Sequence, residues 1–238
     1  MGALGRASRW RWTALGLTGR IVDLSLPLKS GSVSPPSQSK RTEVSTLRRG
    51  PGHWQATTVW MSVHTASHID SPLHCLADAV PIGEVALEKT IGEAVIVDLT
   101  HIDADAKVAA QDLGGCKGRV REGDIVLLWT GWSDRKFGDP DYFAASPYLT
   151  DEAALYLAEM KPKAVGFDFF QEYAAKTNDF TPEDFTVHRV FMTRGITIME
   201  GLTNLGSLPR ERVMFFGAPL KMMESEAAPA RFFALVED

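Results

Sequence analysis

Three near-continuous apolar runs constrain the fold of this chain more than any other feature. They read EAVIVDLT (93–100), DIVLLWTG (124–131) and KAVGFDFF (163–170). Runs of this kind are typical of strands that are covered on both faces. Because such strands occur in sheets with helices packed against them, the runs predict the centre of an α/β domain.

Shorter patterns complete the predicted sheet and its helices. Further strands are expected at 20–28, 55–63, 196–200, 212–220 and 231–237. Helices are expected at 149–162 and 180–195, both of which carry capping signals, and a Ser/Pro-rich loop at 30–44. Strands outnumber helices, so we predict a single α/β domain, over 20–238, built around a large mixed sheet with flanking helices.

The composition limits the classes of function. The 238 residues suit one large domain, and the formal net charge of −5 argues against a nucleic-acid surface, which is usually strongly basic. No window approaches the ~20 apolar residues that a membrane helix needs. Two cysteines, Cys75 and Cys116, suit a reducing compartment, so a cytoplasmic location is expected. Residues 1–19 contain arginines but no acid, and we predict a disordered or mobile extension there.

The stretch HTASHIDSPLH (64–74) gathers three of the six histidines and an aspartate. A helix would swing Asp70 about 200° beyond His68, and Pro72 also argues against a helix. A straight strand would spread His64 and His74 over roughly 33 Å, which is too far for one site. The segment must therefore curl.

The spacing favours a strand that ends near His64 and a turn at Ala66–Ser67. His68 and Asp70 then point to one place, while Ile69 between them faces the core. Neutral imidazoles and carboxylates are ligands that suit zinc or manganese. The stretch therefore predicts a metal site, with a polar turn as the alternative.

A second histidine and acid lie where apolar residues are expected. His188 lies on an apolar face of the second predicted helix, and Glu200 shares the side of Ile196 and Ile198 in its strand. A buried carboxylate costs several kcal/mol unless it is paired or bound to a metal. The alternative is that Glu200 reaches water at the strand end or pairs with Arg194.

The stretch resembles the signature H-x-G-T-H-x-D-x-P-x-H of a metal-dependent cyclase/hydrolase family that includes bacterial kynurenine formamidase and isatin hydrolase. Ala66 stands at the signature's glycine, and Ser67 stands at its threonine. The likeness continues in IVDLSLPL, GDIVLLWTGW, AVGFD, HRVFMTRGITIMEGLTNL and APLKMMESEAAPARFFALVED, and so covers roughly residues 20–236. It implies a barrel-like, kynurenine-formamidase-like sheet and a homodimer.

The resemblance also implies a role for each polar residue. One or two divalent ions, zinc or manganese, would be held by His64, His68, Asp70, His188 and Glu200. Asp70 would bridge the two ions, and His74 would be the catalytic acid/base. The presence of Glu200 favours two ions over the single manganese of the isatin hydrolase branch.

We therefore expect a metal-dependent hydrolase of a small amide, similar to an arylformamidase acting on an N-formyl aromatic amine such as N-formylkynurenine. The nearest alternative is isatin-hydrolase-type ring opening of a cyclic amide or imide, because the same residues serve both reactions. A metal-dependent cyclase or lyase and a non-catalytic metal-binding domain are further alternatives. Four aromatic residues are candidates to clamp a flat substrate, unless they belong to the core: Trp60, Trp132, Phe169 and Phe170.

Overall fold

The computed structural model describes residues 9–12, 17–38, 41–177, 179–209 and 212–237. A nine-stranded mixed sheet has the strand order β1-β2-β13-β12-β6-β8-β10-β11-β5. Its strands are β1 (Arg9–Trp12), β2 (Leu17–Asp23), β5 (His68–Asp70), β6 (Ile91–Asp98), β8 (Ile125–Trp129), β10 (Ala164–Phe167), β11 (Thr197–Glu200), β12 (Arg212–Pro219) and β13 (Ala227–Glu237). The other elements are β3 (Glu43–Arg49), β4 (Trp54–Trp60), β7 (Lys107–Val108), β9 (Tyr148–Leu149), α1 (Trp132–Lys136), α2 (Asp151–Glu159) and α3 (Thr186–Met192).

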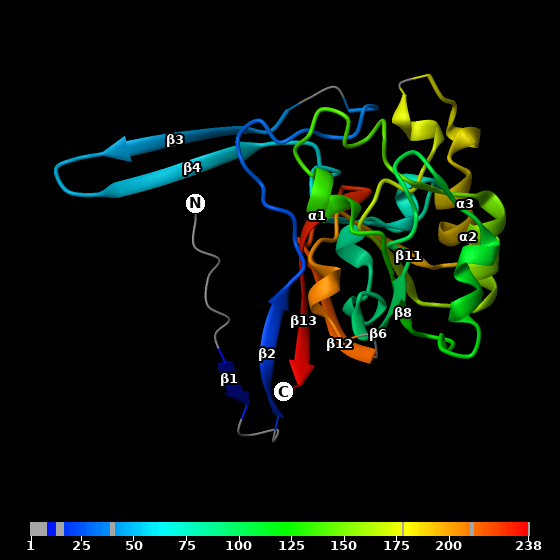
Figure 1. Cartoon of the computed structure of the whole chain (residues 1–238). Helices are drawn as coiled ribbons and strands as arrows, with labels where there is room; N and C mark the ends of the chain where they lie inside the picture. The colour runs from blue at the N-terminus through cyan, green and yellow to red at the C-terminus, as the bar shows by residue number, and fades with distance from the viewer. Residues whose placement is uncertain (1–8, 13–16, 39–40, 178, 210–211, 238) are drawn as a thin grey trace.

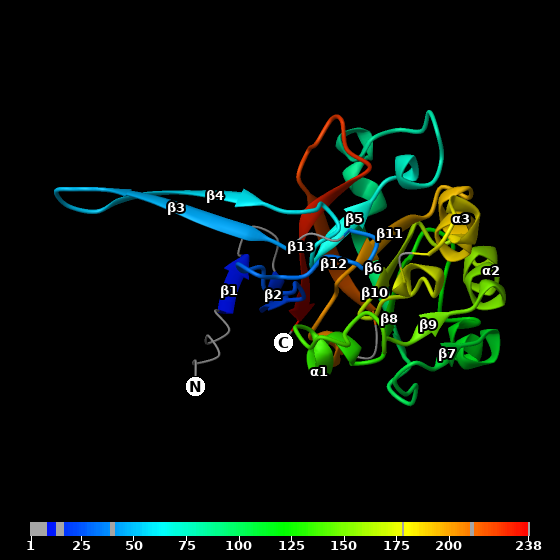
Figure 2. The same cartoon turned by 90° about the horizontal axis from the view of Figure 1, so that it is seen from above.

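Seven strands of this sheet close into a barrel, because β13 pairs with β5 as well as with β12. β6, β8, β10 and β11 run parallel to one another, whereas β12, β13 and β5 are antiparallel to their neighbours. Helices α2 and α3 lie outside the parallel strands (Figures 1 and 2). The predicted α/β fold with a barrel-like mixed sheet and flanking helices is confirmed.

The apolar runs are buried on both faces, as predicted. In β8, Ile125 and Leu127 belong to the cluster inside the barrel, whereas Val126 and Leu128 belong to the cluster beneath the helices. All four side chains are fully buried. Burial of each large apolar side chain contributes about 1.5–3 kcal/mol, so the two layers together hold the sheet in place.

The first predicted helix is confirmed, and the second is divided. The Thr150 side chain caps α2 by accepting a hydrogen bond from the backbone N–H of Ala153 at 3.2 Å. The predicted helix at 180–195 instead consists of a 3₁₀ turn (Pro182–Asp184) and α3, separated at Phe185, whose ψ is 59°. The Asp184 carboxylate closes the 3₁₀ turn by accepting hydrogen bonds from Thr181, and the Phe185 ring then packs against His188.

Strands β3 and β4 form a hairpin that projects from the barrel (Figures 1 and 2). The strand predicted at 55–63 is present as β4 but ends at Trp60, and the loop predicted at 30–44 ends where β3 begins at Glu43. The strand predicted at 20–28 likewise ends early, at Asp23. Residues 61–67 form turns and bends instead, because the chain must reverse before it enters β5. Every residue of β3 and β4 is exposed.

The predicted N-terminal extension, 1–19, lies partly outside the described residues. Its described parts lie in β1, which pairs with β2, and in the first residues of β2. The predicted domain boundary at residue 20 therefore falls inside β2, which begins at Leu17. No helix among the described residues is long and apolar enough to cross a membrane.

Candidate metal centre

The short strand β5 places two of the predicted ligands through its register. It pairs with β11 so that His68 lies opposite Glu200 and Asp70 lies opposite Ile198. Residues that face each other across an antiparallel pair project to the same side of the sheet. His68, Asp70 and Glu200 therefore share the outer face of the barrel, and Ile69 is fully buried inside it, as predicted.

The turn before β5 brings His64 back to the same place. Ala66 has a φ of 58°, in the left-handed region, and this reverses the chain at the predicted position. The Ser67 hydroxyl holds the turn: it donates to the Gly201 carbonyl at 2.6 Å and accepts from the Leu26 N–H at 2.8 Å. Gly201 packs so closely that a Cβ there would overlap the backbone of Ala66.

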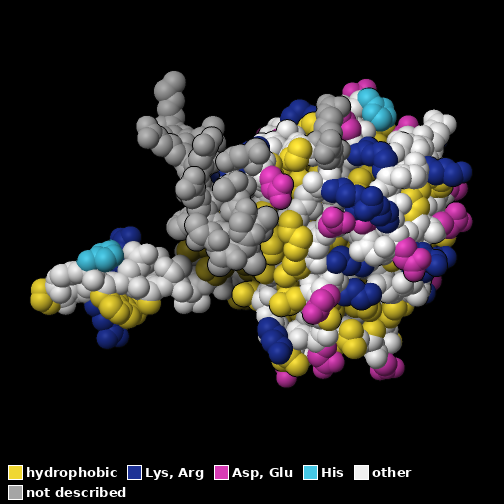
Figure 3. All heavy atoms as spheres, turned by 90° about the horizontal axis from the view of Figure 1, so that it is seen from below, with side chains coloured by type: hydrophobic (Ala, Val, Ile, Leu, Met, Phe, Trp, Pro, Cys, Tyr) yellow, Lys and Arg dark blue, Asp and Glu magenta, His cyan; other side chains and the backbone are white. Residues whose placement is uncertain are grey.

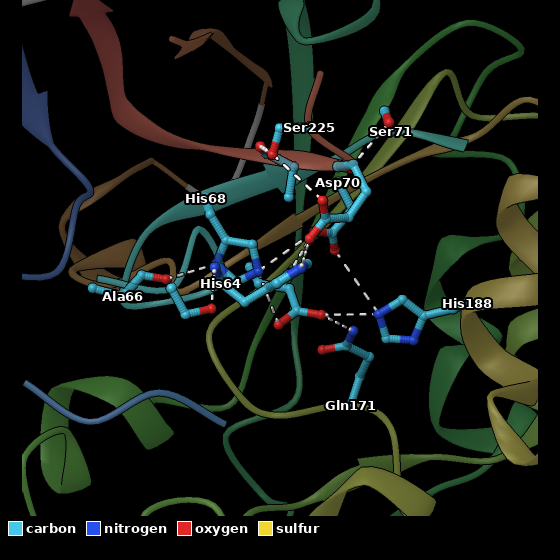
Figure 4. Close-up of polar contacts among 12 residues, drawn as sticks. His64, Ala66, His68, Asp70, Ser71, Gln171, His188 and Ser225 are labelled. Atoms are coloured by element: carbon cyan, nitrogen blue, oxygen red, sulfur yellow. Dashed lines mark hydrogen bonds and ion pairs between the residues drawn. The ribbon is translucent and has the colours of Figure 1, made fainter. Parts of the chain in front are cut away.

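His64, His68 and Asp70 form the first cluster, and all three are buried (Figure 4). His64 Nδ1 lies 3.1 Å from Asp70 Oδ1, and His68 Nε2 lies 3.5 Å from the same oxygen. Their ligand atoms could face one small ion.

Asp70, His188 and Glu200 form the second cluster, so Asp70 belongs to both (Figure 4). His188 Nε2 lies 3.2 Å from Glu200 Oε1 and 3.9 Å from Asp70 Oδ2. Gln171 donates from Nε2 to Glu200 Oε1 at 2.6 Å and so orients that carboxylate. Four elements thus meet at this cluster: the helix α3, the loop after β10, and the neighbouring strands β5 and β11.

Several of these atoms fit a bound cation better than a hydrogen-bond network. His68 Nε2 and both carboxylate oxygens of Asp70 are buried and have no hydrogen bond within the described part of the chain. Such orphaned groups are costly unless something else satisfies them. Nitrogen and carboxylate donors at this spacing are the donor set of a zinc or manganese site.

The opposite nitrogen of two imidazoles is already engaged. His68 Nδ1 donates to the Ala66 carbonyl at 2.9 Å, and His188 Nδ1 donates to Glu172 Oε2 at 2.8 Å. Because each of these bonds is made by Nδ1, the Nε2 atom of each ring faces the cluster. Metal-binding histidines almost always make this second bond.

Burial and close charges set the protonation of the centre. Burial alone lowers the pKa of His64, but its contacts with Asp70 and Glu226 outweigh burial and raise the pKa to about 10. The hydrogen bond with His64 lowers the pKa of Glu226 to about 2. Burial raises the pKa of Asp70, yet the charges of His68 and His64 hold it below its usual range. The carboxylates therefore stay ionised and hold a proton on His64, and a metal cation would have to replace that proton for His64 to become a ligand.

His74 lies beside both clusters without belonging to either of them. Its ring centroid is 4.5 Å from that of His64 and 5.4 Å from that of His188. Pro72 opens the 3₁₀ turn that carries His74 out of β5. Burial lowers the pKa of His74 to about 4, so its imidazole is neutral near pH 7 and can accept a proton.

The structure separates the four aromatic candidates into two pairs. Phe169 and Phe170 border small cavities beside the clusters, of about 20 and about 30 Å³, each with room for about one water. Trp132 is buried in the core, where its Nε1 donates to the Tyr142 carbonyl. Trp60 lies on the exposed hairpin, 48% exposed. Neither tryptophan lines these cavities.

Sequence reasoning missed three polar residues that support the centre. Glu172 holds His188, Gln171 holds Glu200, and Glu226 lies 3.0 Å from His64 Nε2. For Gln171 and Glu172, the sequence offers one signal, which is that they directly follow the largely apolar run GFDFF. The structure shows that both side chains are buried. Glu226 has no such signal, since it precedes β13 in a mixed polar segment.

Known proteins resemble this chain in sequence and in structure. The model of the Cyclase family matches residues 22–171, which is more than half of the chain. This chain belongs to the Cyclase family. Among curated relatives, kynurenine formamidase of Bacillus mycoides is 22% identical over 215 residues, covering 90% of this chain and 96% of the relative. That of Delftia acidovorans is 25% identical over 226 residues, covering 90% and 97%.

Two solved structures share nearly the whole fold of this chain. Isatin hydrolase A from Labrenzia aggregata has a TM-score of 0.78 and 25% identity, covering 92% of this chain and 94% of that one. A predicted metal-dependent hydrolase from Bacillus stearothermophilus has a TM-score of 0.71 and 27% identity, covering 90% and 97%. The resemblance stated from sequence is thereby confirmed.

Replacing Ala66 with glycine should stabilise the protein. A left-handed conformation costs an alanine about 1–2 kcal/mol, which glycine avoids at some cost in chain entropy. We expect a net gain of about 1 kcal/mol, or a Tm about 2–4 °C higher by calorimetry. Ala86→Gly is the matched control, because Ala86 has a φ of −64° and should lose stability instead. A lower Tm for Ala66→Gly would contradict the assigned strain.

Removing the carboxylate behind His188 should weaken metal binding. Glu172→Ala frees the His188 ring to rotate, and loss of such a supporting group typically costs 10–100-fold in metal affinity. Competition with a chromophoric chelator measures the change, and Glu159→Ala, an exposed acid at the end of α2, is the control. Equal metal affinities of the two variants would show that Glu172 does not support the centre.

Proposed function

We propose that this chain is a metal-dependent hydrolase that cleaves a carbon–nitrogen bond in a small amide, with an N-formyl aromatic amine as substrate. The observation that carries the proposal is the pair of buried clusters sharing Asp70, with three orphaned ligand atoms between them. The kynurenine formamidase relatives support the substrate class, because they match nearly the full length of the chain.

The residues that would hold one or two divalent ions, zinc or manganese, are His64, His68, Asp70, His188 and Glu200. A divalent ion bound there would polarise the substrate carbonyl and lower the pKa of a water molecule. Glu172 and Gln171 would keep the donors of the second cluster aimed inward. If two ions bind, Asp70 would belong to the ligand set of each.

His74 is the group that moves protons in this proposal. A ring nitrogen of the neutral imidazole accepts a proton from the attacking water and later returns it to the leaving amide nitrogen. The hydroxyl of the water joins the carbonyl carbon as the carbon–nitrogen bond breaks, so a carboxylic acid and an amine result. Its position supports this role, because the His74 ring lies 4.5 Å from the His64 ring and 5.4 Å from the His188 ring, measured between centroids.

Phe169 and Phe170 supply an apolar wall for a flat substrate beside the clusters. Each adjacent cavity has room for about one water, so an aromatic group could bind beside the clusters only after these rings move apart. A second candidate is ring opening of a cyclic amide, favoured by the likeness of the whole fold to isatin hydrolase A. We also propose that the enzyme is a homodimer.

Metal content and substrate choice test this function together. Elemental analysis of protein purified without added metal should find about one or two zinc or manganese ions per chain, and chelation should abolish turnover. The preparation is then assayed with N-formylkynurenine, isatin and a set of cyclic imides. Turnover of the formyl amide supports the proposal, and turnover of isatin alone supports the second candidate. A folded protein that binds no divalent metal would overturn both.

His74→Ala should separate catalysis from metal binding. Loss of a general acid/base typically costs 10²–10⁴-fold in rate, so kcat should fall by at least about 100-fold. The metal content should stay close to that of the unaltered protein, because His74 belongs to neither fully buried cluster; its ligand atom groups with those of His64 and Glu226, where His74 and Glu226 are only half-buried, and a large loss of metal would assign the ion to that third group. His101→Ala is the control, since His101 is 59% exposed and lies away from the centre. Full activity of His74→Ala would exclude the assigned role.

A further inference from the structure

Two small cavities lie beside the metal centre, and four residues line both of them: Pro35, His64, Phe170 and Glu200. The cavity volumes are about 20 and about 30 Å³, whereas an apolar cavity of about 150 Å³ can hold a benzene ring. Neither cavity therefore admits an aromatic group as it stands. If the wall that these four residues form were to open, the two cavities would join into a single pocket.

The first cavity, of about 20 Å³, is largely aromatic away from the centre, and we call it the aromatic cavity. Five aromatic side chains line it: Phe137, Tyr142, Phe143, Phe169 and Phe170. All of these except Phe169 form a chain of edge-to-face contacts, with successive ring centroids 5.4, 5.0 and 5.1 Å apart. Aromatic rings prefer this arrangement. A flat apolar group that entered the cavity would therefore find further ring edges and faces to pack against.

The second cavity, of about 30 Å³, contains the polar groups that the proposed reaction needs, and we call it the polar cavity. His74 lines it, together with Ser37 and Gln38. His74 does not line the aromatic cavity. Because His64 and Glu200 line both cavities, a substrate that spanned the two would lay its middle against the proposed metal ligands, with one end toward His74.

Three of the four shared residues are held in place. The Phe170 N–H donates to the Ser146 hydroxyl at 2.8 Å, and both residues are buried. His64 and Glu200 belong to the two buried clusters, so neither could move away without giving up the proposed ion. Pro35 belongs to no cluster, and a proline has no backbone N–H through which it could be held. Of these four residues, Pro35 is therefore the one that can move.

Pro35 lies in the segment Ser34–Gln38, here called the strap, which is weakly attached to the body. Within the described part of the chain, one hydrogen bond joins the strap to the body, between Ser34 Oγ and Thr65 Oγ1 at 2.8 Å. The Gln38 N–H donates to the Pro35 carbonyl, which lies inside the strap itself. The last two residues of the strap are exposed. Segments with so few hydrogen bonds open at a low cost in free energy.

We propose that the two cavities are the halves of one substrate pocket, which opens when the strap lifts; this extends the proposed function and rests on it. The aromatic cavity takes the ring of the N-formyl aromatic amine, and the polar cavity takes its amide. Phe143 limits the size of the ring that can enter. Its half-buried ring lies between Tyr142 and Phe170 in the chain of contacts, and it has no polar group to satisfy.

Surface charge gives no competing basis for selection on the face of the body that Figure 3 shows. Basic and acidic side chains are interspersed there, with hydrophobic side chains between them. A surface attracts charged ligands when one sign of charge dominates it. Neutral aromatic molecules are accordingly the probes that test the pocket.

The first test varies the size of the ring. Calorimetry and ligand-observed NMR measure how the full-length, metal-loaded protein binds aniline and 4-tert-butylaniline. The unaltered protein should prefer aniline, and Phe143→Ala should shift the preference toward the larger probe by at least about tenfold, because an apolar pocket discriminates strongly by size. Phe216→Ala is the matched control, since Phe216 is also half-buried but stacks on Phe233 and lines neither cavity. An unchanged preference in Phe143→Ala overturns the proposal.

A second variant at the same position covers the case in which Phe143→Ala does not fold, which circular dichroism would show. Phe143→Trp fills the aromatic cavity and should weaken aniline binding by at least about tenfold. Unchanged aniline binding by a folded Phe143→Trp would also overturn the proposal.

Binding and turnover separate this proposal from the proposed function. Hydrolysis of N-formylaniline with no shift of preference in Phe143→Ala would leave the function standing and exclude the pocket. A shift of preference without hydrolysis of any formyl amide would support the pocket and exclude the function.

The last test fastens the strap reversibly. Ser34→Cys with Thr65→Cys introduces two thiols where the hydroxyl oxygens lie 2.8 Å apart, so that oxidation should join them in a disulfide. The oxidised form should bind aniline at least about tenfold more weakly than the reduced form, because apparent affinity falls with the fraction of open protein. Elemental analysis checks that both forms keep their metal. Ser34→Cys alone, oxidised in the same way, is the control and should bind aniline normally.

Two outcomes of this test overturn the role of the strap. One is a fastened protein that binds aniline as well as its reduced form does. The other is failure of the disulfide to form, since that would show that Ser34 and Thr65 do not hold the strap against the body.

Discussion

Closure of the barrel by β5 is the constraint on which both fold and centre depend. Three residues, His68–Asp70, pair on one edge with β11 and on the other with β13. Because side chains alternate along a strand, a shift of one residue would turn Ile69 outward and drive His68 and Asp70 into the barrel. That would lose about 1.5–3 kcal/mol of apolar burial and bury a carboxylate among hydrocarbon side chains. The register that closes the sheet is therefore also the register that assembles the ligands.

The centre gathers more charge than a folded chain normally buries. Asp70 and Glu200 face His68 and His188 within 4 Å, all behind the protein surface. Removing such groups from water costs several kcal/mol each unless their partners satisfy them. Hydrogen bonds satisfy the far side of the imidazoles and one inner pair, His188 Nε2 with Glu200 Oε1, but they leave His68 Nε2 and both carboxylate oxygens of Asp70 without a partner among the described residues. A divalent cation would satisfy all the inner atoms at once, whereas rearranging hydrogen bonds could satisfy only some of them.

Sequence alone predicted the features that depend on local periodicity. The apolar runs marked β6, β8 and β10, and period-two alternation placed Ile69 toward the core and Glu200 on the same side of its strand as Ile198. The supporting acids Glu172 and Glu226 escaped prediction, because each acts on a histidine 16 or 162 residues away and follows no spacing rule. Only β4 of the hairpin was predicted, as the strand at 55–63, and β3 escaped for a different reason. Its residues alternate without burying either face on this chain, so the pattern of burial that normally reveals a strand is missing.

The segment from Trp60 to Ser67 joins the β3–β4 hairpin to the centre, and its conformation decides where His64 lies. The strand β4 ends at Trp60, and within seven residues the chain must reverse and enter β5. The reversal uses a left-handed alanine, which is a strained choice for a residue with a side chain. Strain of this kind persists only where surrounding contacts hold it, and here the Ser67 hydroxyl and Gly201 do so from within the chain.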